Sequence, residues 1–259
     1  MLIDRLSYMS RLRDINPILK VLTAFFSIVI CIWADSFVIS ILTLLSMTTL
    51  ITCFGGTKIK YLLHLMTVPA SFVMLGSAAA VLIVSSSRLG MSHAFSLGSI
   101  YIGISKDSII TAFRIMIKCF GSLSCMYFLS LTTPMIDLFG LLRRSILPDF
   151  IVEIMELVYR YIFVLHDASD RIHTAQDSRL GYSSLRLGCH SVGVLAANVF
   201  IRAYRQADKT YTAMESRGYN GEIRLLKGKY ARNIHGYIAM SVFVMFMAIT
   251  AIICRRYGV

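Results

Sequence analysis

Two short stretches of the chain repeat the same polar residues and are the clearest candidates for a chemical role. Each reads Ala, any residue, an acid, Ser and Arg, followed by Gly and Tyr, and the copies cover residues 175–182 and 213–219. A helical pattern meets Gly in both, and Gly can supply the left-handed residue at a helix end. The pattern therefore predicts each Arg in the last turn of a helix.

One such copy would be an ordinary helix cap, with a cation that complements the helix dipole. Two similar copies favour the recognition of two similar partners. The planar guanidinium of Arg suits carboxylates in partly buried interfaces.

His166, Asp170 and His173 are a second candidate, because positions i, i+4 and i+7 share one helix face. Imidazole and carboxylate groups are ligands for divalent transition metals. They are also ordinary surface groups, and the surrounding segment is the most charged part of the chain. We interpret the three residues as a solvated helix face and predict no metal site.

Arg114 and Lys118 lie one turn apart inside an apolar block, where charges are costly. One interpretation is a function or a buried partner, although no acidic residue in an apolar block offers itself. The other is that the membrane span begins later and both side chains reach an interface. We interpret His64, in another apolar block, as a helix-packing residue.

The elements that position these residues are predicted to be membrane helices. The 259 residues are 56% hydrophobic and 15% charged, with a mean hydropathy of +0.69, which excludes an ordinary soluble domain. Apolar blocks of about 18 residues or more match the hydrocarbon layer of a bilayer. We predict an all-α polytopic membrane protein with about five spans, at residues 21–34, 37–54, 61–85, 109–131 and 236–254.

The segment between the fourth and fifth blocks has a different composition. Residues 135–232 hold 14 of the 26 Lys and Arg residues and 10 of the 14 Asp and Glu residues. Apolar residues in 151–165 recur at helical spacing, and a second amphipathic helix is predicted at 192–217. The excess of basic residues places this segment and the N-terminus in the cytoplasm.

Three parts follow from this pattern: four spans in residues 1–134, cytoplasmic helices in 135–232 and a last span in 233–259. Residues 86–108 lack helical periodicity and are predicted to form an outer loop or a short β-like excursion.

Several function classes are disfavoured by the same sequence. The net charge of +12 comes from basic residues at the ends of apolar blocks or among acids, so we predict no nucleic-acid partner. The six Cys residues form no CxxC pair. No apolar block carries an acid, a His pair or a nucleophile with its base, so we predict no enzyme. A stand-alone secondary transporter would show repeated membrane halves, which this chain lacks.

The chain closely resembles the transmembrane T component of energy-coupling-factor transporters, in its cobalt-type CbiQ branch, over nearly its whole length. The residues that carry the resemblance are 3–5, 12–20, 127–134, 156–164, 171–176 and 213–221. The resemblance implies a multi-pass scaffold in the cell inner (plasma) membrane, with cytoplasmic coupling helices that dock onto two ATPase subunits. It also implies a separate substrate-capturing membrane component, with or without a small accessory membrane subunit.

The family's paired coupling motifs are three residues centred on Arg, typically Ala-Arg-Gly. They map onto Ser178, Arg179 and Leu180, and onto Ser216, Arg217 and Gly218. Leu180 departs from the pattern and both copies begin with Ser, so the two arginines are the firmest correspondence. ATP would be used by the partner subunits, since this chain has no phosphate-binding loop and no cofactor of its own is implied. Overall resemblance favours import of cobalt, with nickel as the alternative.

Overall fold

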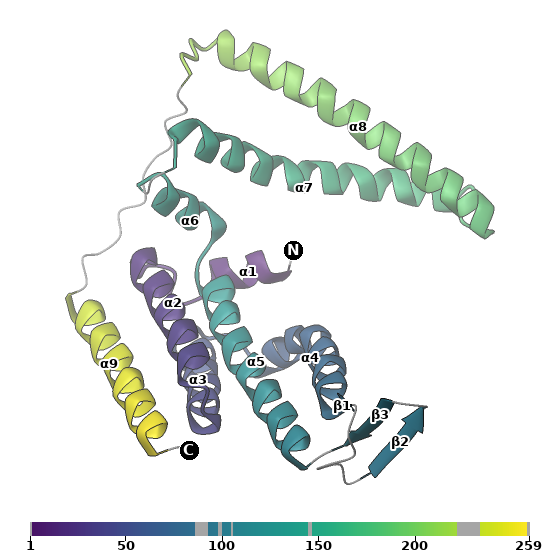
Figure 1. Cartoon of the computed structure of the whole chain (residues 1–259). Helices are drawn as coiled ribbons and strands as arrows, with labels where there is room; N and C mark the ends of the chain where they lie inside the picture. The colour runs from purple at the N-terminus through teal and green to yellow at the C-terminus, as the bar shows by residue number, and fades with distance from the viewer. Residues whose placement is uncertain are drawn as a thin grey trace. The chain divides into compact units, whose positions relative to one another are not determined.

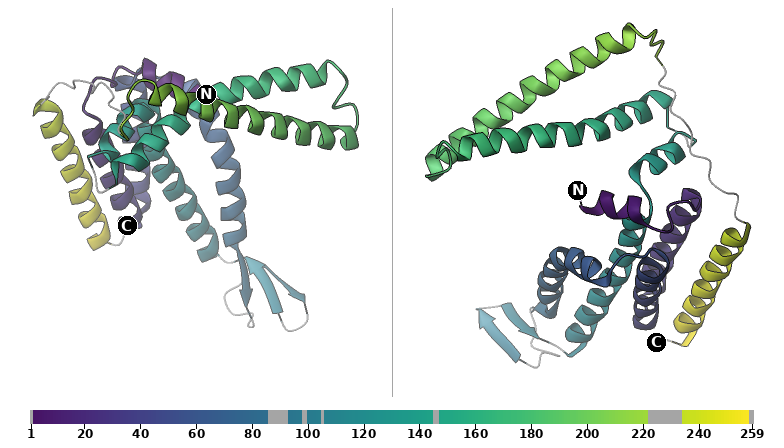
Figure 2. Two further views of the ribbon diagram at one scale, coloured as in Figure 1. Left: turned by 90° about the horizontal axis from the view of Figure 1, so that it is seen from above. Right: turned by 180° about the vertical axis from the view of Figure 1, so that it is seen from behind.

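The computed structural model describes the chain at residues 2–85, 93–97, 100–104, 106–144, 147–221 and 234–257. These residues form two compact units, one from residues 1–138 with 229–259 and the other from residues 139–228. We call the first the membrane unit and the second the helical unit, and describe each by itself (Figures 1 and 2).

Five helices of the membrane unit are long and apolar enough to cross a bilayer, which confirms the predicted all-α polytopic fold. A short helix, α1 (Leu2–Met9), precedes them. The spanning helices are α2 (Pro17–Ala34), α3 (Phe37–Thr49) with the π-helical turn η1 (Leu50–Phe54), α4 (Ile59–Val81), α5 (Lys106–Thr132) and α9 (Ile234–Tyr257).

A small antiparallel sheet lies between α4 and α5. It consists of β1 (Leu82–Ser85), β2 (His93–Leu97) and β3 (Ile100–Ile104), in the order β1-β3-β2. The third apolar block was predicted as one span to residue 85, and this is wrong at its end, because the helix stops at Val81. The next residues, Leu-Ile-Val-Ser, include two β-branched side chains that favour a strand.

Helix α2 is joined to the antiparallel α5 near each of the two ends of α2. The Lys20 Nζ donates to the Thr132 carbonyl over 2.9 Å, and the Lys118 Nζ lies 2.7 Å from the Asp35 Oδ1. The two contacts on α2 are separated by about 22 Å of helix, at 1.5 Å per residue. Lys20 is only 3% exposed, so its ammonium caps the last carbonyl of α5 inside the protein.

Helix α9 runs parallel to α2 and is also held near both ends. The Asn16 Nδ2 donates to the Tyr237 Oη over 2.8 Å, while the Arg255 guanidinium lies 4.5 Å above the Trp33 ring. Helix α1 and the last turn of α9 lie at opposite ends of the membrane unit, as Figure 1 shows. Trp33 and Arg255 are residue types that anchor helix ends at a membrane interface.

At Gly121, α5 approaches α2 and α3 closely. A Cβ at this position would lie 2.9 Å from the Ser40 carbonyl, 3.0 Å from the Thr43 Oγ1 and 3.2 Å from the Cys31 Sγ. Thr43 also donates to the buried Cys31 Sγ over 3.6 Å. Close backbone packing around small and hydroxyl residues is typical of helices in membranes.

The helical unit contains two long helices, α7 (Asp149–Asp177) and α8 (Leu185–Glu215), after the short α6 (Met135–Leu142), which leads into it. The second amphipathic helix was predicted to start at residue 192 and in fact starts seven residues earlier. Ser184 explains this, because its side chain accepts a hydrogen bond from the Leu187 N–H and caps the helix. At the opposite end of α8 from this cap, Thr210 pairs with Tyr161 of α7.

Candidate functional site

The two Arg-containing stretches form turns with matching backbone hydrogen bonds, directly after α7 and α8. In the first turn, the Ser178 N–H donates to the Thr174 carbonyl and the Gly181 N–H to the Gln176 carbonyl, over 3.0 and 2.9 Å. In the second, the Ser216 and Tyr219 N–H groups donate to Thr212 and Met214, both over 3.0 Å. We call them the first and second Arg turns, residues 178–181 and 216–219.

The side chains that lead into the turns match as well. Ser178 and Ser216 each donate their hydroxyl to the carbonyl four residues earlier, both over 2.8 Å. Thr174 and Thr212 do the same to Asp170 and Asp208. The repeat thus begins at Asp170 in the first copy and at Asp208 in the second, and corresponding residues of the two copies are 38 positions apart. Sequence reasoning missed this extension, although the Asp and Thr pairs at that offset were visible in the sequence.

The left-handed residue of the first turn is Leu180, at φ 58°, and not Gly181 as predicted. Its counterpart in the second turn is Gly218, at φ 76°. Gly181 is needed for a different reason, because a Cβ there would lie 2.8 Å from the Ser191 Oγ and 2.9 Å from the Gln176 carbonyl. A left-handed Leu carries a strain of roughly 1–2 kcal/mol that Gly avoids.

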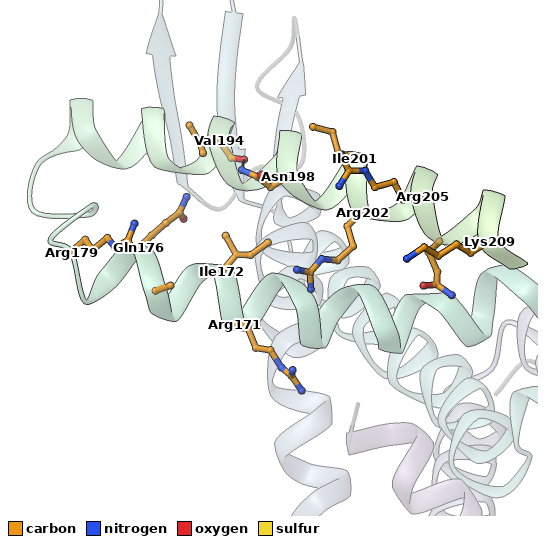
Figure 3. A pocket seen from close by; sticks show the side chains of 12 residues that line it. Arg171, Ile172, Gln176, Arg179, Val194, Asn198, Ile201, Arg202, Arg205 and Lys209 are labelled. Carbon is orange, nitrogen blue, oxygen red and sulfur yellow. Dashed lines mark hydrogen bonds between the residues drawn. The ribbon is translucent and has the colours of Figure 1, made fainter.

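Each turn presents an Arg to the surroundings. Arg179 and Arg217 are exposed, and among the described residues neither forms an ion pair. Arg179 also borders a cleft of about 760 Å³ between α7 and α8, shown in Figure 3. The other cations that line the cleft are Arg171, Arg202, Arg205 and Lys209. No acid among the described residues lines the cleft, so it attracts anionic groups.

His166, Asp170 and His173 do not converge on one point. The His166 Nε2 lies 3.7 Å from the Asp170 Oδ2 at the surface, whereas the His173 ring stacks on Tyr182 with centroids 4.6 Å apart. Within the described ranges, no three or more His, Cys, Asp or Glu residues are grouped so that they could hold a metal ion. His64 is exposed on α4.

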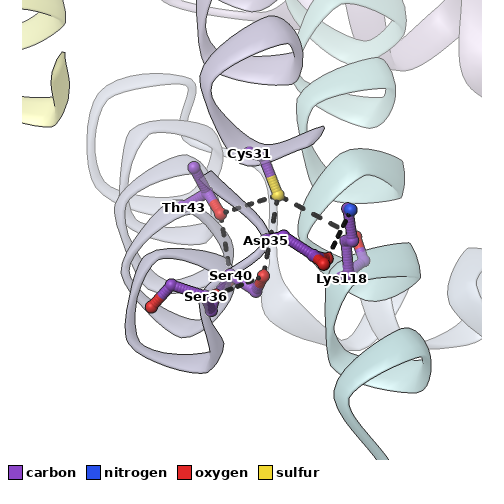
Figure 4. A network of polar contacts seen from close by, with 6 residues as sticks. All are labelled: Cys31, Asp35, Ser36, Ser40, Thr43 and Lys118. Atoms are coloured by element: carbon purple, nitrogen blue, oxygen red, sulfur yellow. Dashed lines mark hydrogen bonds and ion pairs between the residues drawn. The ribbon is translucent and has the colours of Figure 1, made fainter. Parts of the chain in front are cut away.

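Lys118 has an acidic partner that the sequence analysis did not identify. Asp35 lies in the two-residue turn between α2 and α3, outside the apolar blocks that were searched for acids (Figure 4). The hydrogen bond from Lys118 holds the pKa of the Asp35 carboxyl below its ordinary value, and the charges of Lys118 and Arg114 act in the same direction. Lys118 thus lies level with a turn at the end of two spans, which favours the interface interpretation.

Replacing Asp35 with Asn should lower the melting temperature of the purified chain slightly at pH 7. The carboxyl is 66% exposed, so the pair contributes at most about 1 kcal/mol, or roughly 2–4 °C. Because the folded-state pKa is lowered, this contribution is present above the unfolded pKa of about 3.9 and is lost as pH falls through the folded pKa. Thermal melts in detergent across the acidic range should show the native chain and Asp35→Asn converging. A constant difference at all pH values would contradict the ion pair.

Comparison with known proteins identifies relatives over most of the chain. A sequence model of the CbiQ family, described as a cobalt transport protein, matches residues 9–227, a range that contains both Arg turns. An uncharacterized protein of Methanocaldococcus jannaschii is 31% identical over 258 residues, which are 99% of this chain and 94% of the relative.

Two further relatives have transport names. A putative fused cobalt transport protein CbiMQ of Methanocorpusculum labreanum is 29% identical over 74% of this chain and 32% of its own length. The energy-coupling factor transporter transmembrane protein EcfT of Lactococcus lactis subsp. cremoris is 31% identical over 47% of this chain and 50% of its own length.

Proposed function

The chain belongs to the CbiQ family of cobalt transport proteins, and from that premise we propose that it is the membrane-embedded coupling subunit of an energy-coupling-factor importer for cobalt. It is a multi-pass membrane protein and a transport component of this type of system. Its proposed role is to transmit the motion of two partner ATPase subunits to a separate membrane component that captures the substrate.

The observation that carries the proposal is the pair of matching Arg turns. Capping α7 and α8 would not require the two turns to match, whereas here they share backbone bonds, serine bonds and an exposed Arg that forms no ion pair with any described residue. Two like ATPase subunits would each supply a carboxylate, and a charge-assisted hydrogen bond from a guanidinium is strong and geometrically specific. Arg179 and Arg217 would be the coupling residues, each flanked by the other two residues of its motif.

Nucleotide chemistry is assigned to the partners. The sequence contains no G-x-x-x-x-G-K-[ST] stretch, whose backbone N–H groups and Lys would hold phosphates. We therefore propose a non-catalytic subunit that binds no cofactor, with ATP bound and hydrolysed by the two ATPase subunits.

We propose that the second partner binds between α7 and α8. An apolar groove of about 480 Å³ lies between the first half of α7 and the second half of α8. Its lining includes Ile154, Val158 and Ile162, each more than half exposed, and such exposed apolar surface is typical of an interaction site. We assign it to the substrate-capturing membrane component. The fused CbiMQ relative, which is about three times as long as the matched region, supports a second membrane component in the assembly.

Metal uptake tests the proposal. Cells that produce the whole assembly should accumulate cobalt only when this chain is present and ATP is available, and excess nickel should compete weakly. Equal accumulation without the chain would contradict the role, whereas stronger competition by nickel would assign the same role to a nickel importer.

Replacing His166 and His173 with Ala should leave uptake nearly unchanged, because neither contributes to a metal site.

The proposed orientation places the helical unit in the cytoplasm of a cell whose inner (plasma) membrane holds the five spans. Cys189 is exposed on α8 and offers a native probe. In a variant that keeps Cys189 as its only cysteine, an impermeant maleimide should label the chain only after the cells are permeabilised. Labelling of intact cells from outside would reverse the topology.

A further inference from the structure

The two Arg turns differ in one respect that their shared hydrogen bonds do not explain. The left-handed position is occupied by Leu180 in the first turn and by Gly218 in the second. Gly adopts this backbone conformation freely, whereas a Leu side chain is crowded against its own carbonyl there. The first turn therefore keeps a side chain at a position where the fold alone would favour Gly.

The Leu180 side chain does not stabilise the chain by burial, because it is 73% exposed. A second leucine close by, Leu185 at the start of α8, is 92% exposed. The backbone strain at Leu180 is not offset by packing of its side chain within this chain. It therefore points to a contact with another protein. An apolar side chain held this way is suited to entering a pocket on another protein.

The surrounding structure holds the strained residue firmly in place. Tyr182 donates to the Gln176 Oε1, Gln176 donates to the Ser191 carbonyl, and the Ser191 hydroxyl donates to the Gly181 carbonyl, over 2.8–2.9 Å. These bonds join the end of α7 to the start of α8 across the turn. At the second turn, by contrast, a Cβ on Gly218 would meet no atom of the described residues within 4 Å.

We propose that Leu180 is a specificity-determining contact, which enters a hydrophobic pocket on one ATPase subunit beside the carboxylate that receives Arg179. This inference rests on the proposed function, because it takes the ATPase subunits as the partners. The second turn contacts the other ATPase subunit through Arg217 and the bare backbone at Gly218. The two turns are thus unequal, and the first binds more tightly because it adds an apolar contact to the charged one.

The test measures ATPase binding to the full chain in lipid nanodiscs, with purified ATPase subunits as the probe. Leu180→Gly removes both the strain and the side chain, so the chain alone should melt at the same or a higher temperature while the affinity falls about tenfold or more. Leu180→Met is the matched control, because it keeps an apolar side chain under the same backbone strain. It should bind within about threefold of the native chain.

Three results would overturn the inference. Leu180→Gly could bind as tightly as the native chain, Leu180→Met could lose as much affinity as Leu180→Gly, or Leu180→Gly could lower the melting temperature, which would assign Leu180 to the fold. The Arg179→Ala variant distinguishes a failure of the Leu180 proposal from a failure of the proposed coupling function. If it loses binding while Leu180→Gly keeps it, only the pocket is wrong; if Arg179→Ala and Arg217→Ala also bind normally, the coupling role itself is wrong.

Discussion

A chain in which Arg179 and Arg217 are both replaced with Ala is expected to insert into the membrane normally and to lose metal uptake. Truncating one partner of a buried, hydrogen-bonded charge pair typically costs about 2–5 kcal/mol, much of it from the charge left unpaired. Each single Ala variant should therefore weaken ATPase docking strongly, and the double variant should weaken it more. Pull-down of the ATPase subunits and uptake of radioactive cobalt measure the two effects separately.

Two controls accompany the Arg variants. Arg→Lys should restore function only in part, because an ammonium cannot reproduce the two-pronged contact of a guanidinium with a carboxylate. Arg160→Ala removes an exposed cation from α7 away from both turns and should leave docking unchanged. If the double Ala variant binds the ATPase subunits and supports uptake normally, the two turns are only helix caps.

Gly121→Ala is expected to destabilise the membrane unit by about 1–3 kcal/mol, the usual range for overpacking a close contact. The new methyl group would lie 2.9 Å from the Ser40 carbonyl, which belongs to the backbone and cannot move aside as a flexible side chain could. Helices α3 and α5 would have to separate, which would also loosen the contacts around Cys31 (Figure 4). Thermal melts of the purified chain in detergent provide the measurement.

Gly76→Ala is the matched control for this substitution. Gly76 also lies inside a spanning helix, but a Cβ there would meet no atom within 4 Å in the part of the chain that the structure describes. Because Ala is intrinsically better than Gly in a helix interior, this variant should be neutral or slightly stabilised. If both variants melt at the same temperature, the close approach at Gly121 does not contribute to stability.

The sequence alone was sufficient to predict the spanning helices, because each of them depends on the apolar residues of its own segment. Apolar blocks of span length predict helices without reference to the rest of the chain, and all five spans were found in this way. The end of α4 was missed because an apolar block continues through residues 82–85, and hydropathy does not distinguish a strand from a helix.

Long-range contacts could not be predicted from the sequence. Lys118 and Asp35 are 83 positions apart, and only the packing of α5 on the α2–α3 hairpin brings them together. The same holds for Lys20 and Thr132, which lie in two of the stretches that carry the family resemblance. The repeated sequence placed the Arg turns correctly next to helix ends, but the prediction that each Arg lies in the last helical turn was wrong, because α7 and α8 end two residues before Arg179 and Arg217. The left-handed residue was predicted correctly in the second turn, Gly218, and wrongly in the first, where Leu180 takes the position expected for Gly181.

We propose that this chain couples two ATPase subunits and catalyses no reaction itself. Native mass spectrometry of the affinity-purified chain, co-expressed with its transporter partners, tests this most directly. We expect a complex with two ATPase subunits per chain, and the ATPase subunits should no longer co-purify when Arg179 and Arg217 are both replaced with Ala. A chain that purifies alone and carries metal into proteoliposomes without nucleotide would contradict it.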